Sequence, residues 1–370
     1  MEEQVVELCK KFNINGKYLD YQVFKNGHIN TTVVARFDKD GDIKEYVLQK
    51  INKNVFKQPE KVMENISNVT NFIKNKLKAK GEKTSRRVLK FSQGVDGKYF
   101  VVDSNGDYWR MYRFVNKSIT FNETEDLNVL EETGKAFGEF QQLLSDYPIK
   151  NLHIIIPHFH NTVNRYQIFK DTVANNPVGR AESVRDEIED YLQLENIATQ
   201  MYKMQKAGEL KLRVTHNDTK CNNVLFDEKT GEYLCVIDLD TIMPGLVGFD
   251  FGDAIRFAAN TCAEDETNLD NVKLDFDKFE AITKGFVSRA GSSLTEQEKA
   301  TLSLGAITMT AECGLRFLTD YIDGDNYFKT DYAEHNLDRA RCQLKLAQDM
   351  IQNYEHMQEI VNKYCDEYTL

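Results

Sequence analysis

The chain has 370 residues, above the size at which a single hydrophobic core usually stops growing, so we expect two lobes. Hydrophobic residues make up 41% of it, which predicts a packed globular protein rather than a disordered one. The net charge of −11 argues against nucleic acid and anionic membranes as partners. The chain shows neither a signal-peptide pattern nor an apolar run near the roughly 20 residues that cross a bilayer. Its seven scattered cysteines favour free thiols, so we expect a cytoplasmic protein.

The first 115 residues show mainly the alternating pattern of β-strands. Strands are expected at residues 18–24, 31–37 and 43–51, because turn-forming Asn-Gly and Asp-Gly pairs separate them. One helix is expected from Pro59 to about Leu77, where apolar residues recur at helical spacing. Further strands are expected between residues 88 and 115, so this part should form a small antiparallel sheet with one inserted helix.

Several residues of this sheet are candidates for binding a nucleotide. The first hairpin could cover phosphates with short polar side chains and backbone amides. The third strand ends in Gln49-Lys50, and alternation lets only one of the two face a cleft; we favour Lys50, with Glu64 as its partner. The segment that leaves the sheet would present main-chain groups to adenine. The candidates are Asn30, Thr31, Thr32, Gln49, Lys50, Glu64, Tyr112 and Phe114.

Beyond residue 115 the spacing of apolar residues becomes helical. Helices are expected at 123–145, at 182–207 and over most of the chain after residue 250, with a short hairpin formed by 223–226 and 233–237. The predicted fold class is α+β, with a bilobal protein-kinase-like arrangement. Residues 1–115 would be a small antiparallel-sheet N-lobe that binds the nucleotide, and residues 116–370 a mostly helical C-lobe with the catalytic hairpin and the sugar site.

The most informative stretch surrounds that hairpin. An apolar run leads into His216-Asn217-Asp218, Asn223 follows five residues after Asp218, and the second strand ends in Asp238. Phosphoryl transfer uses such a set, because one Asp orients the acceptor hydroxyl while an Asn and a second Asp hold Mg²⁺. We therefore predict Asp218 as the catalytic base and Asn223 and Asp238 as metal ligands. A polar turn could explain the loop alone, but it does not explain the two flanking strands.

Three further segments carry polar side chains that need an interpretation. Residues 314–328 are dense in polar and aromatic groups, which recognise polar substrates, so Arg316, Asp320 and Tyr327 are candidate ligands. An ordinary helix end is the alternative reading of this segment. The three histidines of residues 153–160 have no partners at metal-ligand spacing, and we interpret them as ordinary loop residues. The loop before residue 250 is expected to open a helix capped by Asp250.

Taken together, these motifs resemble the aminoglycoside phosphotransferase and choline kinase-like superfamily, and within it the N-acetylhexosamine 1-kinases. The resemblance extends over nearly the whole chain and is carried by residues 27–30, 47–57, 63–66, 109–111, 216–224, 237–245, 249–257 and 316–325. It implies ATP- and Mg²⁺-dependent phosphorylation of the anomeric hydroxyl of GlcNAc or GalNAc. It also implies that the sugar is contacted by His28, Asp218, Asp240, Arg316 and Tyr327.

Two alternatives stay open. One keeps the phosphoryl transfer but changes the acceptor to another sugar, an aminoglycoside or a choline-like amine; Arg316 argues against cationic acceptors. The other is a catalytically silent sensor of sugars or nucleotides. The intact set of Asp218, Asn223 and Asp238 argues against it.

Overall fold

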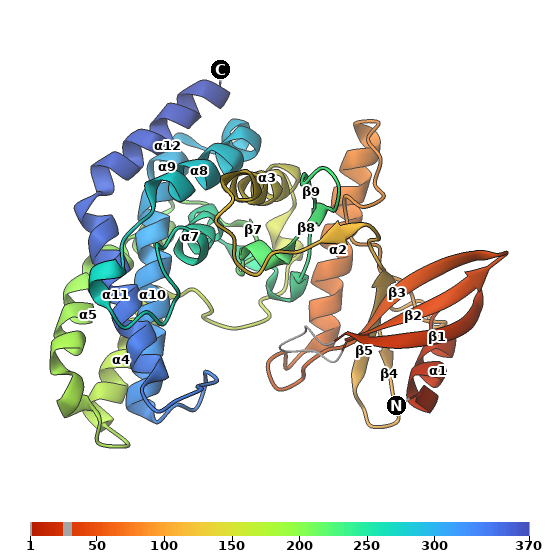
Figure 1. Cartoon of the computed structure of the whole chain (residues 1–370), viewed down its shortest axis with the longest axis horizontal. Helices are drawn as coiled ribbons and strands as arrows, with labels where there is room; N and C mark the ends of the chain where they lie inside the picture. The colour runs from red at the N-terminus through yellow and green to blue at the C-terminus, as the bar shows by residue number, and fades with distance from the viewer. Residues whose placement is uncertain (1, 25–31, 370) are drawn as a thin grey trace.

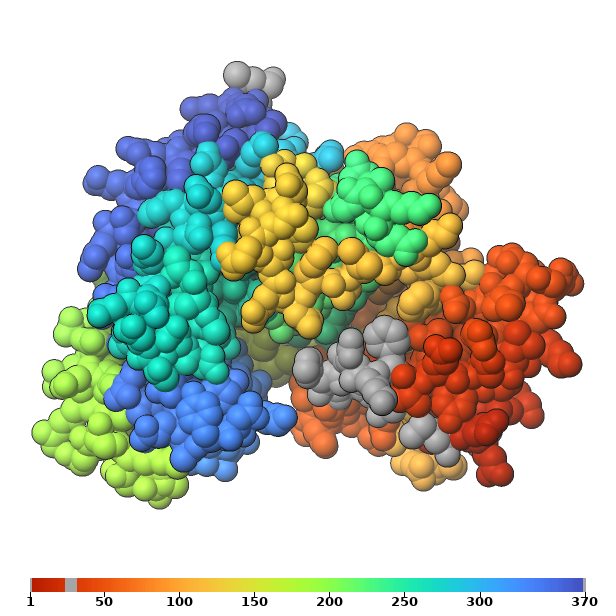
Figure 2. Space-filling view, viewed as in Figure 1, coloured from red at the N-terminus to blue at the C-terminus, as the bar shows by residue number. Residues whose placement is uncertain are grey.

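The computed structural model of the chain describes residues 2–24 and 32–369. The N-terminal part forms an antiparallel sheet and the C-terminal part forms a body of helices (Figure 1). Figure 2 shows the red sheet and the blue helices at opposite ends of the molecule. The predicted α+β class is therefore confirmed.

The N-terminal sheet has five antiparallel strands in the order β1-β2-β3-β5-β4. The expected strands agree well with the first three, but residues 88–93 form no strand. They make only an isolated bridge, between Phe91 and Tyr112, beside β5. The strands are β1 (Lys17–Phe24), β2 (Thr32–Lys39), β3 (Asp42–Lys50), β4 (Val101–Val102) and β5 (Tyr108–Arg113).

A helix that the sequence pattern did not predict covers one face of this sheet. In α1 (Glu2–Lys11), Val5 and Leu8 pack against Leu48 and Trp109. A helix of ten residues is too short to be stable alone in water, so its stability depends on this packing. The expectation of a single helix in the first 115 residues was therefore wrong.

The helix predicted to start at Pro59 is α2 (Pro59–Ala79), and it shares a core with the C-terminal part of the chain. Its apolar face packs with Leu143 and Ile242, among others. Asn65, only 1% exposed, donates to the backbone oxygens of His153 and Ile242 at 2.9 Å each. The boundary that we propose at residue 115 thus separates two regions that share one hydrophobic core.

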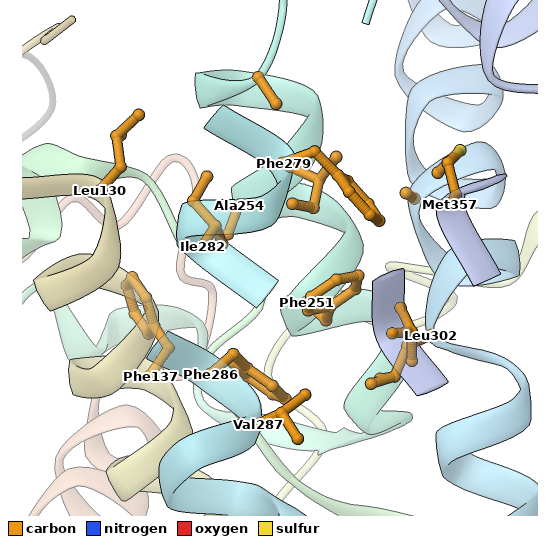
Figure 3. Close-up of a cluster of buried hydrophobic side chains, with 14 of the residues drawn as sticks. Leu130, Phe137, Phe251, Ala254, Phe279, Ile282, Phe286, Val287, Leu302 and Met357 are labelled. Carbon is orange, nitrogen blue, oxygen red and sulfur yellow. The ribbon is translucent and has the colours of Figure 1, made fainter. Parts of the chain in front are cut away.

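The helical body is centred on a cluster of aromatic and aliphatic side chains from α3, α7, α8, α10 and α12 (Figure 3). The helix expected at 182–207 is divided at Thr199, whose hydroxyl bonds the carbonyl of Glu195 at 2.6 Å, a contact that bends helices. The helices are α3 (Leu127–Leu143), α4 (Thr162–Asn175), α5 (Arg185–Ala198), α6 (Gln200–Ala207), α7 (Val247–Ala258), α8 (Phe276–Ala290), α9 (Glu296–Ala300), α10 (Leu302–Asp323), α11 (His335–Gln352) and α12 (Tyr354–Thr369).

Short strands lie between the sheet and the helical body. β7 (Arg213–Thr215) pairs with β10 (Met243–Gly245), while β8 (Val224–Asp227) pairs with β9 (Tyr233–Val236) and β6 (Ser118–Ile119). The hairpin expected at 223–237 is therefore present. Among the described helices, none has the length and apolar character needed to cross a bilayer.

Candidate active site

The loop between β7 and β8 carries Asp218, and Asp238 follows the end of β9. Asn217 (φ 65°) and Asp238 (φ 54°) both adopt the left-handed backbone conformation. Asn and Asp enter this region more readily than most residues, which suits them to these two positions. The two sharp bends direct the chain from short, buried strands into one polar site.

Helix α7 holds the Asp218 loop through its carboxylates. Asp250 is buried and accepts hydrogen bonds from the backbone amides of His216 at 2.9 Å and Asn217 at 2.8 Å. Asp253 accepts from the amide of Thr219 at 2.9 Å. Burial raises the pKa of Asp250, although these donors oppose the shift. The helix begins at Val247 and not at Asp250, so Asp250 braces the loop rather than capping the helix.

Two of the three predicted phosphoryl-transfer residues are in direct contact. The amide nitrogen of Asn223 donates to the backbone oxygen of Asp218 at 2.8 Å and to its Oδ2 at 3.0 Å. Nζ of Lys220 lies 3.1 Å from Oδ1 of Asp218. The side chain of Asp218 is 31% exposed, whereas Asn223 is buried. The loop therefore presents one accessible carboxylate that its neighbours hold in place.

Asp238, the third of these residues, lies in an acidic environment. Burial and the nearby carboxylates of Asp240 and Asp218 together raise the pKa of Asp238 to about 6, against the opposing charge of Arg110. A divalent cation would relieve this excess of negative charge, and carboxylate and amide oxygens are the ligands that Mg²⁺ accepts. Asp238 and Asn223 therefore fit the predicted metal.

A cation at this position would need further ligands beyond the described side chains of Asn223 and Asp238. Within residues 2–24 and 32–369 there is no group of three or more His, Cys, Asp or Glu placed to hold a metal ion. Mg²⁺ usually takes one or two carboxylates and completes its octahedron with substrate phosphates and water. The donor set here is of that kind.

On the sheet side, Gln49 and not Lys50 points toward this site. Gln49 bonds the hydroxyl of Thr32 at 3.2 Å and accepts from Nε of Arg110 at 2.9 Å. Lys50 points to the face covered by α1, where its Nζ lies 2.5 Å from Asp107. The preference for Lys50 was therefore wrong, because the strand register could not be read from the sequence.

Glu64 and Phe114, two more of the predicted nucleotide-site residues, contact other groups of the protein. Glu64 lies 2.8 Å from Nε2 of His153 and is not the partner of Lys50. The backbone amide of Phe114 donates to the carbonyl of Glu45 at 3.0 Å, so this N–H is not available to an adenine ring. Tyr112 lies near the acidic site, and burial there raises the pKa of its hydroxyl to about 12.

Arg110 of β5 was missed by sequence reasoning. Its side chain, 3% exposed, hydrogen-bonds both oxygens of Asp240 and also Gln49. Asp240, predicted to contact the sugar, is thus engaged with an arginine from the sheet. No short motif marks such a residue, since its role depends on how the sheet meets the loop after β9.

The predicted substrate segment forms the wall of a cavity of about 200 Å³ at the end of α10. The guanidinium of Arg316 lies 5.3 Å from the ring centre of Phe328, 5.6 Å from Tyr327 and 5.9 Å from Phe159. Tyr327 is 70% exposed, so its ring can contact a bound molecule. Of the remaining predicted residues, His28, Asn30 and Thr31 lie outside the described part of the chain.

These features can be compared with known proteins. A model of the phosphotransferase enzyme family matches residues 20–280 of the chain. The chain belongs to this family.

Solved structures place the phosphotransferase in a kinase-like fold. A microcompartment-associated aminopropanol kinase is 16% identical, with a TM-score of 0.64 over 96% of this chain and 98% of that one. A spectinomycin phosphotransferase, solved with ADP and spectinomycin, is 15% identical, with a TM-score of 0.56 over 98% of both chains. A choline kinase from Cryptosporidium parvum is 14% identical, with a TM-score of 0.53 over 98% and 99%. At these identities the likeness establishes the fold alone.

A second buried group of the phosphotransferase was also missed. Glu312 of α10, 1% exposed, lies 2.8 Å from Nδ1 of His160, and the ring of His160 packs on Phe249 next to Asp250. Within the described structure, Oε2 of Glu312 and Nε2 of His160 have no hydrogen-bond partner. His160 was predicted to be an ordinary loop residue. No sequence pattern identifies this role, because the partner of His160 lies on α10, 152 positions further along the chain.

Proposed function

We propose that this phosphotransferase is an ATP- and Mg²⁺-dependent kinase that phosphorylates the anomeric hydroxyl of N-acetylhexosamines, giving the sugar 1-phosphate. The observation that carries the proposal is the pairing of Asp218 with Asn223 beside Asp238. This arrangement supplies one accessible carboxylate for a hydroxyl and a second acidic group for a cation.

In the proposed mechanism, the carboxylate of Asp218 orients the acceptor hydroxyl and takes up its proton. The acceptor oxygen bonds to the γ-phosphorus of ATP while the bond from that phosphorus to the bridging oxygen of ADP breaks, and ADP leaves. Asn223 holds that carboxylate, and Lys220 balances its charge. Asn223 and Asp238 would hold Mg²⁺, which would offset the negative charge of the nucleotide phosphates. The protein's share of catalysis is thus positioning and electrostatics.

The choice of acceptor rests on the segment around Arg316. A guanidinium surrounded by three aromatic rings offers planar donors and apolar faces, which together suit the hydroxyl, amide and ring faces of an N-acetylated sugar. The resemblance of the sequence motifs to the N-acetylhexosamine 1-kinases supports the same acceptor.

An amino alcohol is the second candidate acceptor, and one specific observation favours it. Glu312 keeps a buried carboxylate oxygen without a hydrogen-bond partner in the described structure, and an ammonium group would satisfy it. Aminopropanol and choline kinases are among the proteins with a similar fold. Arg165 and Arg316 near Glu312 disfavour a cation, so we rank this acceptor second.

The test is release of ADP from ATP with Mg²⁺ and a panel of GlcNAc, GalNAc, glucose, galactose, aminopropanol, choline and an aminoglycoside. We expect turnover with the N-acetylated sugars, and a loss of that turnover in R316Q. Turnover confined to the amines, abolished in E312Q, would establish the second candidate instead. Absence of turnover with every acceptor, while ATP still binds, would support a sensor.

A further inference from the structure

We propose that Arg110 of β5 makes the cationic contact to the nucleotide phosphates that a lysine of the third strand makes in protein kinases. The proposal rests on the nucleotide half of the proposed function and is independent of the acceptor. It identifies a phosphate-contacting residue on a different strand from the one that the sequence pattern indicates.

The lysine and the glutamate of the expected pair are engaged elsewhere. In protein kinases, a lysine of β3 contacts the phosphates and is held by a glutamate of the following helix. Here Nζ of Lys50 is 2.5 Å from Asp107 on the α1 face of the sheet, and Glu64 is 2.8 Å from His153. Neither side chain of the expected pair is placed to serve a phosphate in the site.

Arg110 lies on the face of the sheet opposite to that of Lys50. β3 and β5 are antiparallel neighbours, and Gln49 stands directly across from Arg110, so both side chains point to the same side of the sheet. That side meets the loop after β9, where Arg110 bonds Asp240 and lies close enough to Asp238 for their charges to interact. A cation is therefore present beside the predicted metal ligand.

The guanidinium of Arg110 has a donor beyond those that bond Gln49 and Asp240. Nε and one NH2 hydrogen point to Gln49, while NH1 and NH2 each donate to Asp240. These contacts use four of the five N–H donors and leave one on NH1. Arginine binds phosphate oxygens strongly through such donors. Asp240 and Gln49 would then hold the guanidinium in place, as the helix glutamate holds the lysine in protein kinases.

The experiment compares binding of adenosine and ADP to the full chain by calorimetry, without any acceptor. A phosphate contact acts only on the ligand that carries phosphates. We therefore expect R110Q to weaken ADP binding by about 10- to 100-fold, in line with a lost charged hydrogen bond, while adenosine binding stays the same. R110K keeps the positive charge but loses the planar set of N–H donors, so it should lower the affinity for ADP less than R110Q does.

The matched control is K50Q, which removes a cation from the other face of the same sheet and should leave the ADP affinity unchanged. Thermal unfolding checks that each variant is folded, and if R110Q does not fold, R110K carries the comparison. If R110Q weakened the binding of adenosine and of ADP equally, Arg110 would only hold the sheet and the loop together, and the proposal would be overturned. A loss of ADP affinity in K50Q but not in R110Q would overturn it as well. If the unmodified protein binds no adenine nucleotide, the proposed function fails as well.

Discussion

Asp218 is held by neighbours on both of its oxygens, which makes it the residue where a small change should have the largest effect. We predict that D218N lowers kcat by roughly 10²- to 10⁴-fold, because the amide cannot accept the proton of the acceptor hydroxyl. Steady-state kinetics with the best acceptor of the panel gives the value.

The same variant should leave ADP binding intact, since the replacement is nearly isosteric and Asn223 still has a partner in the backbone oxygen of residue 218. Calorimetry on D218N therefore serves as the control. An unchanged kcat would contradict the role of Asp218 as base, and a parallel loss of ADP binding would point to a collapsed loop instead.

Site residues that are close together in the sequence were easier to identify than those brought together by the fold. The residues that we propose as base and metal ligands could be selected because their spacing is local, and the structure brings Asp218 and Asn223 into contact. Gln49 and Arg110 could not be assigned, because which of two adjacent side chains faces the site depends on strand register. Glu312 and His160 lie 152 positions apart, and no local pattern links them.

At the scale of elements, α7 supports the site because it packs unusually close to α10. A Cβ atom on Gly252 would lie only 2.2 Å from the carbonyl oxygen of Gly305. We predict that G252A lowers the free energy of unfolding by about 1–3 kcal/mol or more, because the two helix backbones would have to separate. Urea denaturation measures the change.

The control for that variant is E189A, an exposed helix position, where the change should stay within about 0.5 kcal/mol. The G252A variant should also lose activity, since α7 carries Asp250 and Asp253 beneath the Asp218 loop. A free energy of unfolding in G252A equal to that of the wild type would contradict the prediction, because α7 and α10 could then move apart without loss of stability.

β7, which leads into the Asp218 loop, is anchored by a buried ion pair that should make stability depend on pH. Nε of Arg213 lies 2.6 Å from Oε1 of Glu298, and both side chains are buried. Burial alone would raise the pKa of Glu298, but the hydrogen bonds from Arg213 and the amide of Thr295 outweigh it and lower this pKa. The unfolded chain therefore binds the proton more readily than the native one.

It follows that this pair contributes its full stability above the unfolded-state pKa of glutamate, about 4.3, and loses it as pH falls through the lower native value. Urea unfolding between pH 7 and pH 3 should show a steeper loss for the wild type than for E298Q. At pH 7, E298Q should be less stable by roughly 3–5 kcal/mol, because Arg213 stays buried without its partner. Parallel pH profiles for the two proteins would contradict this.

Strands and long helices of the first half were predictable because their patterns are periodic, as at β1 to β3 and α2. α1 was not, since its ten residues form a helix only when packed on the sheet. The break between α5 and α6 was not either, because it depends on one side-chain bond of Thr199. For α1, tertiary contacts outweigh the local pattern, whereas the break at Thr199 follows from a single local bond.

At the scale of the whole molecule, the sheet and the helical body share a core through α2, and the polar site lies where they meet. Arg110 from the sheet and Asp240 from the loop after β9 form a buried contact across this junction. The site therefore depends on both halves of the chain at once. The length of the chain predicted two lobes, but not the side chains that join them.

The measurement that tests the central claim most directly is ³¹P NMR of the product formed from ATP, Mg²⁺ and GlcNAc. Our account predicts a new phosphomonoester signal coupled to the anomeric proton, absent when EDTA is added and absent with D218N. A phosphate on another hydroxyl would keep the phosphoryl transfer but contradict the assignment of the 1-position. No transfer to GlcNAc or GalNAc, with transfer to an amino alcohol, would contradict the sugar kinase itself.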